Sequence, residues 1–346
     1  MMTKPLLQIN DLKTSFFSDR GEIKAVNGIS LTLEAGRTIG IVGESGSGKS
    51  ITSLSIMQLL HGTSGKIMDG EILLKGQDLL KLKESEMRKI RGNEISMIFQ
   101  EPMTSLNPTM KIGEQIAEAI RIHQQASRKA AWNKAVDMLD KVGIPSPEKR
   151  ASQFPFELSG GMRQRVMIAM ALASNPELLI ADEPTTALDV TIQAQILKLI
   201  KTLQTETNTA MIMITHDLGV IAETCDDVAV MYCGKIVEYT DVVTLFKNPL
   251  HPYTKGLLAS LPTHEEKKEK LEIIEGHVPS PYELPSGCAF APRCPYATDL
   301  CHEQMPALKD GRVRCIHSEA IECGLHKKMV IKTDVTTQEK GGASVL

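Results

Sequence analysis

The 346-residue sequence lacks any apolar run of the ~18 residues that a helix needs to cross a bilayer. Its first residues, 1–10, lack the positively charged and then apolar layout of a signal peptide. It also lacks an excess of positive charge, since 39 Lys and Arg residues face 42 Asp and Glu residues and the formal net charge is -3. Sequence-independent binding to nucleic acid depends on many Lys and Arg contacts to phosphate. These absences predict a cytosolic chain that spans no membrane itself and has no nucleic-acid partner.

The bulk composition is that of an ordered globular protein, with 42% apolar and 23% charged residues. At the usual ~100 to 200 residues per domain, the length predicts two domains, or one large domain with an appendage. Seven cysteines are present, and a reducing cytosol argues against disulfides among them. Clustering among these cysteines would therefore indicate a metal site or chance.

Three short apolar runs, 38–42, 178–181 and 211–215, are typical of parallel strands that are buried on both faces. The first leads into a glycine-rich turn, the second into two acidic residues, and the third into a histidine. Ligands of open α/β sheets bind beyond the carboxyl ends of the strands. We therefore expect the three strand ends to converge on one site.

Helical periodicity and proline content indicate how the rest of the chain is divided. Residues 100–158 carry helical periodicity, at 112–122 and 130–142, which indicates a helical insertion into the sheet domain. After Asn248 the sequence becomes proline-rich and irregular, which marks a boundary. The expected organisation is a domain at 1–250 with a helical subdomain at about 103–175, an extension at 251–325, and a mobile tail at 326–346.

A phosphate-binding loop is the strongest local motif. Residues 43–50 match G-x-x-x-x-G-K-[ST] in full, after an apolar strand and before a helical pattern at 51–60. Glycines let the backbone curl around phosphate oxygens, Lys49 would reach the β- and γ-phosphates, and Ser50 would hold Mg²⁺. The alternative, a glycine-rich turn that matches by accident, is disfavoured by the flanking strand and helix. The predicted ATP-binding residues are Gly43, Glu44, Ser45, Gly46, Ser47, Gly48, Lys49, Ser50 and Ile51.

Polar side chains follow the other predicted strands. Asp182 is placed to bind Mg²⁺ and Glu183 to polarise the water that attacks the γ-phosphate, although alone the two acids could begin a solvated loop. Gln100 could serve Mg²⁺ or the attacking water, and His216 could sense the γ-phosphate; each is a weak signal by itself. The predicted catalytic residues are Lys49, Gln100, Glu183 and His216, and the predicted magnesium ligands are Ser50, Gln100 and Asp182.

A second anion-binding element lies at residues 158–165, Leu-Ser-Gly-Gly-Met-Arg-Gln-Arg. A serine followed by two glycines at a helix start presents backbone N–H groups to an anion. One nucleotide does not need two such elements from one chain, so we expect a dimer in which each chain completes its partner's site. The segment resembles the signature sequence of ABC ATPases. Its predicted partner-site residues are Leu158, Ser159, Gly160, Gly161 and Met162.

The resemblance to the ABC ATPase family extends from Leu6 to about Asp241. It implies an α/β P-loop NTPase fold with a parallel-sheet core, an N-terminal antiparallel β subdomain and a helical subdomain. It also implies an aromatic residue that stacks on adenine, for which Phe16 is the matching position and Phe17 the register alternative. In family order the motifs are the phosphate loop, Gln100 of the Q-loop, the signature, Asp182 and Glu183, the D-loop residues Ala187, Leu188 and Asp189, and the switch residue His216.

The tail resembles the C-terminal extension of oligopeptide, dipeptide and nickel importer ATPases. The residues that carry this resemblance are Asn-Pro-Leu-His-Pro-Tyr at 248–253 and Gly-Cys-Ala-Phe-Ala-Pro-Arg-Cys-Pro at 287–295. The resemblance implies the ATP-hydrolysing subunit of a bacterial peptide importer, peripheral on the cytoplasmic face of the membrane. Its implied partners are two transmembrane permease subunits, a second and paralogous ATPase subunit, and an extracytoplasmic substrate-binding protein. Nickel or another small solute is the alternative cargo.

Cys288, Cys294, Cys301 and Cys315 have the spacing C-x5-C-x6-C-x13-C in an irregular, small Cys-rich C-terminal domain. Metal ligation could supply folding energy to a segment too short for a good core. The spacing fits poorly with the tight pairs of zinc sites. A [4Fe–4S] cluster takes four cysteines from irregular loops, and the resemblance to peptide importer ATPases implies one here. Zinc and unligated thiols remain the alternatives, and Cys323 could replace Cys315.

Three rival functions are disfavoured by the sequence. A soluble ABC ATPase of DNA repair or translation usually has a long coiled-coil insert or two cassettes, which this sequence lacks. An iron–sulphur redox or sensor module with a vestigial nucleotide site is disfavoured by intact Lys49, Asp182, Glu183 and His216. A P-loop kinase would have no use for the signature segment.

Overall fold

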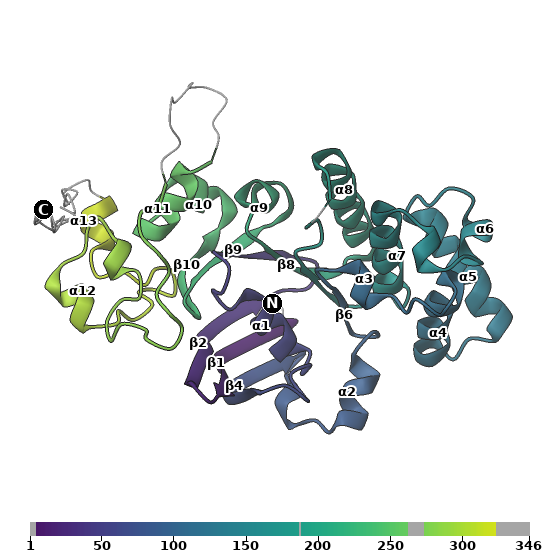
Figure 1. Cartoon of the computed structure of the whole chain (residues 1–346), viewed down its shortest axis with the longest axis horizontal. Helices are drawn as coiled ribbons and strands as arrows, with labels where there is room; N and C mark the ends of the chain where they lie inside the picture. Colours follow the sequence, from purple (N-terminus) through teal and green to yellow (C-terminus); the bar gives the residue numbers. More distant parts are fainter. Residues whose placement is uncertain (1–4, 187, 262–272, 323–346) are drawn as a thin grey trace, which may run out of the picture.

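A six-stranded sheet lies at the centre of the molecule (Figure 1). The computed structural model describes residues 5–186, 188–261 and 273–322; the predicted mobile tail, Cys323 and Ala187 lie outside them. The strand order is β10-β9-β3-β8-β7-β6, with β10 antiparallel to β9 and the other neighbours parallel. The strands are β3 (Thr38–Val42), β6 (Ile95–Ile98), β7 (Leu178–Asp182), β8 (Ala210–Thr215), β9 (Asp227–Tyr232) and β10 (Lys235–Asp241).

Every residue of β3, β6, β7 and β8 is buried. Such strands need cover on both faces, which explains why each is a continuous apolar run instead of an alternating one. The predicted parallel core is therefore confirmed, including the three expected strand positions. Before the C-terminal extension, the α-helices outside the insertion are α1 (Lys49–Ile56), α2 (Glu84–Ile90), α8 (Val190–Thr207), α9 (Leu218–Thr224) and α10 (Val242–Lys247).

An antiparallel sheet of order β2-β1-β4-β5 forms the expected N-terminal subdomain. Helix α1 contributes Ile56 to an apolar core that also holds Leu7 and Ile72 of this sheet and Ile41 and Ile214 of the central sheet. The two sheets thus share one core around the helix that follows the phosphate loop. The strands are β1 (Leu7–Ser18), β2 (Gly21–Leu33), β4 (Gly65–Leu74) and β5 (Gln77–Asp78).

Helix α1 is shorter than the expected helical pattern at 51–60. It ends at Ile56, and Gln58 adopts a left-handed conformation with φ 49°. A left-handed residue cannot continue a right-handed helix, so the chain leaves the helix here; of the next two residues, Leu60 is buried and Leu59 is exposed.

The helical insertion is confirmed as a bundle at one end of the molecule (Figure 1). Ile116 and Ile120 of α4, Leu139 of α5 and Val166 of α7 are buried in its core. Each such fully buried side chain contributes roughly 1.5–3 kcal/mol to stability. The elements are α3 (Pro102–Ser105), α4 (Ile112–Gln124), α5 (Arg128–Lys141), α6 (Pro147–Ala151), η2 (Pro155–Glu157) and α7 (Gly160–Leu172).

The C-terminal extension packs against the edge of the central sheet. The backbone N–H of Tyr239 donates to Arg312 at 2.7 Å, and that of Arg314 donates to Val237 at 2.8 Å, which adds a short segment beside β10. Phe290 and Tyr253 lie in the same apolar cluster as residues of β3 and β9. The extension and the sheet therefore share a core. Its helical elements are α11 (Pro252–Ala259), η3 (Ala291–Arg293), α12 (Asp299–Glu303) and α13 (Ser318–Glu322).

A buried carboxylate fixes the junction between the sheet and the extension. Glu238 of β10 is 1% exposed and accepts hydrogen bonds from the backbone N–H groups of Leu250 at 2.7 Å and His251 at 2.9 Å. Burial raises the pKa of this carboxyl group. The N–H groups at the start of α11 would otherwise lack partners, so Glu238 sets where the extension begins.

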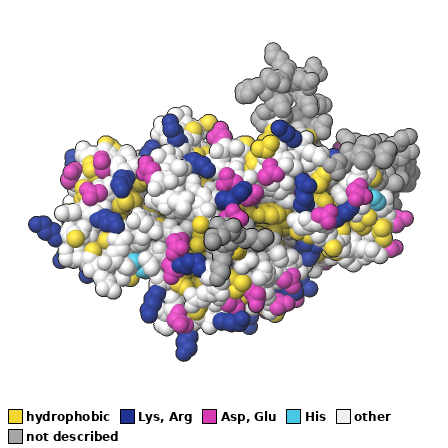
Figure 2. All heavy atoms as spheres, turned by 180° about the vertical axis from the view of Figure 1, so that it is seen from behind, with side chains coloured by type: hydrophobic (Ala, Val, Ile, Leu, Met, Phe, Trp, Pro, Cys, Tyr) yellow, Lys and Arg dark blue, Asp and Glu magenta, His cyan; other side chains and the backbone are white. Residues whose placement is uncertain are grey.

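The surface agrees with the near-balanced charge. On the face shown in Figure 2, Lys and Arg side chains are interspersed with Asp and Glu side chains. No helix among the described residues is long and apolar enough to span a membrane.

Candidate functional site

The phosphate-loop candidate lies between β3 and α1, as expected. Gly48 has φ 102° and Gly46 has φ 78°, conformations that residues with a Cβ atom rarely adopt. A Cβ atom at Gly48 would also collide with the carbonyl oxygen of Ala25. The glycine pattern is therefore required by the backbone shape of the loop.

Lys49 lies buried beneath the loop. Its Nζ donates to the carbonyl oxygens of Gly43 at 2.7 Å and Glu44 at 3.1 Å. Burial lowers the pKa of Lys49, although the negative charges of Glu183 and Asp182 act in the opposite direction. A buried ammonium group that donates to carbonyl oxygens would gain from a strongly anionic partner such as a triphosphate.

Ser50 near the start of α1 meets Asp182 at the end of β7. The Ser50 hydroxyl donates to Oδ1 of Asp182 at 2.9 Å, and the Ser53 hydroxyl is 3.5 Å from Oδ2. Asp182 is 4% exposed, and burial raises its pKa. A hydroxyl and a carboxylate side by side are oxygen ligands of the kind that Mg²⁺ prefers, so the two predicted ligands fit this ion.

Three strand ends bring their polar side chains to Glu183. Gln100 donates through Nε2 to Oε2 of Glu183 at 3.1 Å, and Nδ1 of His216 lies 3.5 Å from Oε1. The hydroxyl of Thr186 also donates to Oε2, at 2.9 Å. Glu183 itself has φ 45°, a conformation that costs on the order of 1–3 kcal/mol in a non-glycine residue. His216 at the end of β8 thus lies beside Glu183 at the end of β7, as expected of converging strand ends, and Gln100 after β6 lies there as well.

The signature segment begins helix α7. The Ser159 hydroxyl accepts a hydrogen bond from the backbone N–H of Met162 at 3.4 Å, and the buried Leu158 anchors the turn. Ser159 and Gly160 are exposed, and a Cβ atom on Gly160 would meet no atom within 4 Å. Figure 1 shows α7 within the helical subdomain, next to α4, α5 and α6, whereas α1 lies over the antiparallel sheet. An exposed helix start placed apart from α1 is available to a second chain.

A buried glutamine connects the signature helix to the catalytic strand end. Gln164 is 2% exposed and donates through Nε2 to the carbonyl oxygen of Pro184 at 2.5 Å. Pro184 directly follows Glu183. The hydrogen bond therefore connects the signature helix α7 to the segment that follows Glu183 within one chain.

Two further predicted motifs are the aromatic residue that would stack on adenine and the D-loop. Phe16 is half-buried in β1 against Gly65, whereas Phe17 is 40% exposed with Nζ of Lys66 5.8 Å from its ring centre. Successive strand residues point to opposite faces, so only one of the two rings can face a bound base. Of the D-loop residues, Asp189 caps α8 by accepting from Ile192 at 3.3 Å.

The four predicted cysteine ligands line one small cavity in the extension. Cys288, Cys294, Cys301 and Cys315 all contribute to its wall. Burial raises the pKa of Cys294 to about 12 and that of Cys315 to about 11. In the described parts of the chain, however, no group of three or more His, Cys, Asp or Glu side chains is arranged as metal ligands. The four thiols therefore share one cavity without forming a metal-ligand group in the described structure.

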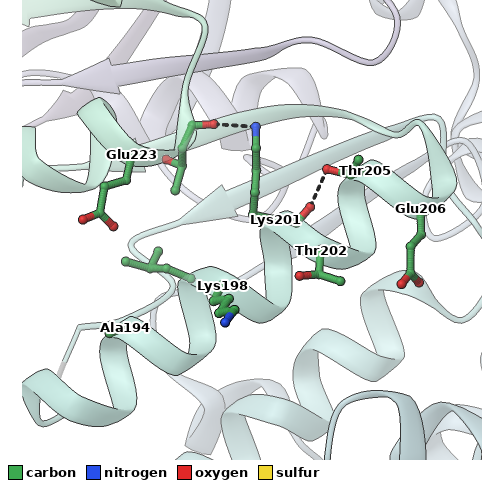
Figure 3. Close-up of a pocket in the computed structure, with 9 residues that line it drawn as sticks. Ala194, Lys198, Lys201, Thr202, Thr205, Glu206 and Glu223 are labelled. Carbon is green, nitrogen blue, oxygen red and sulfur yellow. Dashed lines mark hydrogen bonds between the residues drawn. The ribbon is translucent and has the colours of Figure 1, made fainter.

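A separate cavity between α8 and α9 holds none of the predicted site residues (Figure 3). Lys201 crosses it and donates through Nζ to the carbonyl oxygen of Thr224 at 3.0 Å. Leu197 and Lys198 also line this cavity.

Comparison with known proteins decides the family. Residues 26–186 match the family described as ABC transporter, and residues 237–301 match the oligopeptide/dipeptide transporter, C-terminal region. The oligopeptide transport ATP-binding protein AppD of Bacillus subtilis is 56% identical over 314 residues, which cover 90% of this chain and 96% of AppD. This chain belongs to the ABC transporter ATP-binding proteins. As an ABC ATPase it hydrolyses ATP, and the family implies ATP and Mg²⁺ as its ligands.

Other ABC ATPases extend the comparison. The oligopeptide transport ATP-binding protein OppD of Salmonella typhimurium is 50% identical over 311 residues, covering 89% of this chain and 92% of OppD. Among solved structures, the ATP-binding cassette MJ0796, a dimer in a post-hydrolysis state bound to ADP and Pi, matches with a TM-score of 0.62 and 27% identity. The match covers 68% of this chain and 98% of that cassette.

The sequence patterns did not reveal several contacts to the site. Thr186 was not among the predicted site residues, yet its hydroxyl donates directly to Glu183. Tyr253 and Arg293 of the extension both contact Glu44 in the phosphate loop. Arg293 lies beside Cys294 in the segment that carries the family resemblance, but no local pattern indicates its distant partner.

Proposed function

We propose that this ABC ATPase powers a bacterial importer of dipeptides or oligopeptides. The observation that carries the proposal is the joint presence of one chain's share of a nucleotide site, with Lys49, Ser50, Asp182 and Glu183, and a C-terminal region of the oligopeptide/dipeptide transporter type at 237–301. AppD and OppD, both named as oligopeptide transport proteins, support the same cargo for this chain. Nickel or another small solute is the second candidate.

In the proposed cycle, ATP and Mg²⁺ are held by Lys49, Ser50 and Asp182 of one chain. Ser159 and the glycine N–H groups of a partner chain then close over the γ-phosphate, because an exposed helix start attracts an anion. Glu183 polarises the attacking water, while Gln100 and His216, which contact its carboxylate, report whether the γ-phosphate is present. Hydrolysis cleaves the γ-phosphate from ADP. When the phosphate leaves, the charge that holds the two chains together is lost and the chains separate.

The proposed partners follow from this cycle. They are a second ATPase subunit, which we propose to be a paralogue, two transmembrane permease subunits and an extracytoplasmic substrate-binding protein. Closure would reach the permeases through the surface between Gln100 and the helical subdomain. The chain would therefore work as a peripheral subunit on the cytoplasmic face of the membrane.

Transport by the assembled complex tests the cargo. Proteoliposomes that hold the two permeases and both ATPases should take up a labelled oligopeptide when ATP is supplied on the side of this subunit and binding protein on the other. The matched control carries Glu183→Gln in this chain. Uptake of nickel with no uptake of peptide would support the second candidate and contradict the first.

We also propose that Cys288, Cys294, Cys301 and Cys315 hold a [4Fe–4S] cluster, with zinc as the alternative. The support is that all four line one cavity in an irregular segment. When bound, such a cluster supplies metal–thiolate bonds that cross-link these loops. Because the buried thiols have raised pKa values, metal binding would release protons.

Anaerobic purification is expected to give a brown protein with about four iron atoms per chain and a broad visible absorbance. Cys294→Ser should lose both the colour and the iron. The matched control is Cys225→Ser, because Cys225 is also partly buried but does not line the cavity. A colourless protein with stoichiometric zinc would support the alternative, and a metal-free protein would contradict both.

A further inference from the structure

Hydrogen bonds from two parts of the C-terminal extension meet at one residue of the phosphate loop, Glu44. Nη1 of Arg293 donates to both carboxylate oxygens of Glu44, at 3.0 and 3.2 Å. The backbone N–H of Glu44 donates to the hydroxyl of Tyr253 at 2.9 Å. Arg293 belongs to η3 and Tyr253 to α11, so two separate elements of the extension hold one loop residue.

Arg293 is held firmly in its own place. Its Nε donates to the carbonyl oxygen of Glu275 at 3.0 Å, and its Nη2 donates to that of Ile274 at 3.3 Å. Nη1 also donates to the hydroxyl of Tyr232 at 3.3 Å. The residue is 8% exposed, so salt screens its interaction with Glu44 far less than it screens a surface ion pair. The guanidinium group is therefore a fixed positive charge beside the loop.

Tyr253 is equally fixed. Its ring is fully buried and lies 4.7 Å from the ring centre of Tyr232 and 5.4 Å from that of Phe290. Packing of this kind leaves the hydroxyl no alternative position from which to meet the N–H of Glu44.

Two physical consequences follow for the loop. Its glycines permit many backbone conformations, so external contacts that select one conformation reduce the entropy lost when a triphosphate binds. In addition, the carboxylate of Glu44 would repel a triphosphate bound in the same loop unless its charge is balanced. Arg293 provides that balance, whereas Tyr253 only restrains the backbone.

We propose that Arg293 and Tyr253 are positioning residues that act on the phosphate loop through Glu44. Arg293 balances the charge of the Glu44 carboxylate and Tyr253 restrains its backbone, so that the extension raises the affinity of the chain for ATP. This inference rests on ATP binding by the loop and goes beyond the role proposed for the cysteines.

The test is the dissociation constant for ATP, measured on the full-length chain by competition with a fluorescent ATP analogue. Arg293→Gln should raise the dissociation constant about tenfold, as expected for a lost hydrogen bond to a charged group. Tyr253→Phe removes one hydroxyl and should raise it about threefold. Adding Glu44→Gln to Arg293→Gln should restore much of the affinity, because the unbalanced carboxylate is then gone.

Matched controls separate positioning from general stability. Arg314 lies in the same extension and donates to the carbonyl oxygens of Ile236 and Pro306, away from the loop. Arg314→Gln should lower the melting temperature with no change in ATP affinity. Tyr239→Phe is the control for Tyr253→Phe, since its hydroxyl contacts Thr32 at 3.4 Å.

The outcomes are distinct. If Arg293→Gln does not fold, Tyr253→Phe and Glu44→Gln still report on the same contact, and an unchanged dissociation constant in Tyr253→Phe overturns the proposal. Variants that melt earlier but bind ATP as the unmodified chain does also overturn it. Failure of the unmodified chain to bind ATP would instead contradict the nucleotide site itself.

Discussion

Replacing Glu183 by Gln is expected to lower the rate of ATP hydrolysis by about 10²- to 10⁴-fold while leaving ATP bound. The amide keeps the shape of the side chain and can still hydrogen-bond to Thr186 and Gln100, but it cannot accept a proton from the attacking water. Bound ATP then persists, and two chains closed over it stay together. Steady-state hydrolysis and ATP-dependent light scattering of the purified assembly measure the two effects.

The companion variant for this experiment is Ser159→Arg in the Glu183→Gln background. Ser159 caps an exposed helix start and has no part in the phosphate loop, so this chain should still bind ATP but fail to close on its partner. Unchanged hydrolysis in Glu183→Gln would remove Glu183 from the catalytic role. Closed dimers that persist with Ser159→Arg would contradict the shared site.

Replacing Lys49 by Ala is expected to reduce ATP affinity or turnover by about 10²- to 10³-fold, since a preorganised charged donor to the phosphates is lost. Lys49 is the buried cation whose Nζ lies against two loop carbonyl groups, and burial already lowers its pKa. Equilibrium binding of a fluorescent ATP analogue, together with steady-state hydrolysis, measures the change. Unlike Glu183→Gln, this variant should form no ATP-dependent dimer.

Lys201→Ala is the matched control for Lys49→Ala. Lys201 is also a lysine that donates to a backbone carbonyl oxygen, that of Thr224, but it lies in the groove between α8 and α9 (Figure 3). It should leave ATP binding unchanged. Equal losses in both lysine variants would indicate general destabilisation instead of a specific role for Lys49.

Much of the site could be predicted because each of its motifs consists of residues that are contiguous in the sequence. The glycine pattern of the phosphate loop, the acidic pair after β7 and the serine that begins α7 each follow from local backbone requirements. The meeting of the phosphate loop, the acidic pair and His216 could also be expected, because parallel strands end at the same edge of a sheet. The distance of 3.5 Å between Nδ1 of His216 and Oε1 of Glu183 agrees with that expectation.

Other features could not be predicted from local pattern. The apolar residues after Ile56 continue a helical period, yet Gln58 turns left-handed and the helix stops. The sequence left open whether the extension is a second domain or an appendage, and the apolar cluster that holds Phe290 and Tyr253 also contains residues of the central sheet. In both places tertiary packing decides what the local pattern leaves open.

By itself the sequence determined the family, the nucleotide chemistry and the order of the motifs, because each depends on residue types at short, fixed spacings. Only the tertiary structure decided that Arg293 lies against Glu44, 249 residues away, and that Tyr253 accepts a hydrogen bond from the same loop. The physical reason is that a contact across such a separation depends on how the extension packs on the sheet edge, and a short-range pattern carries no record of that packing.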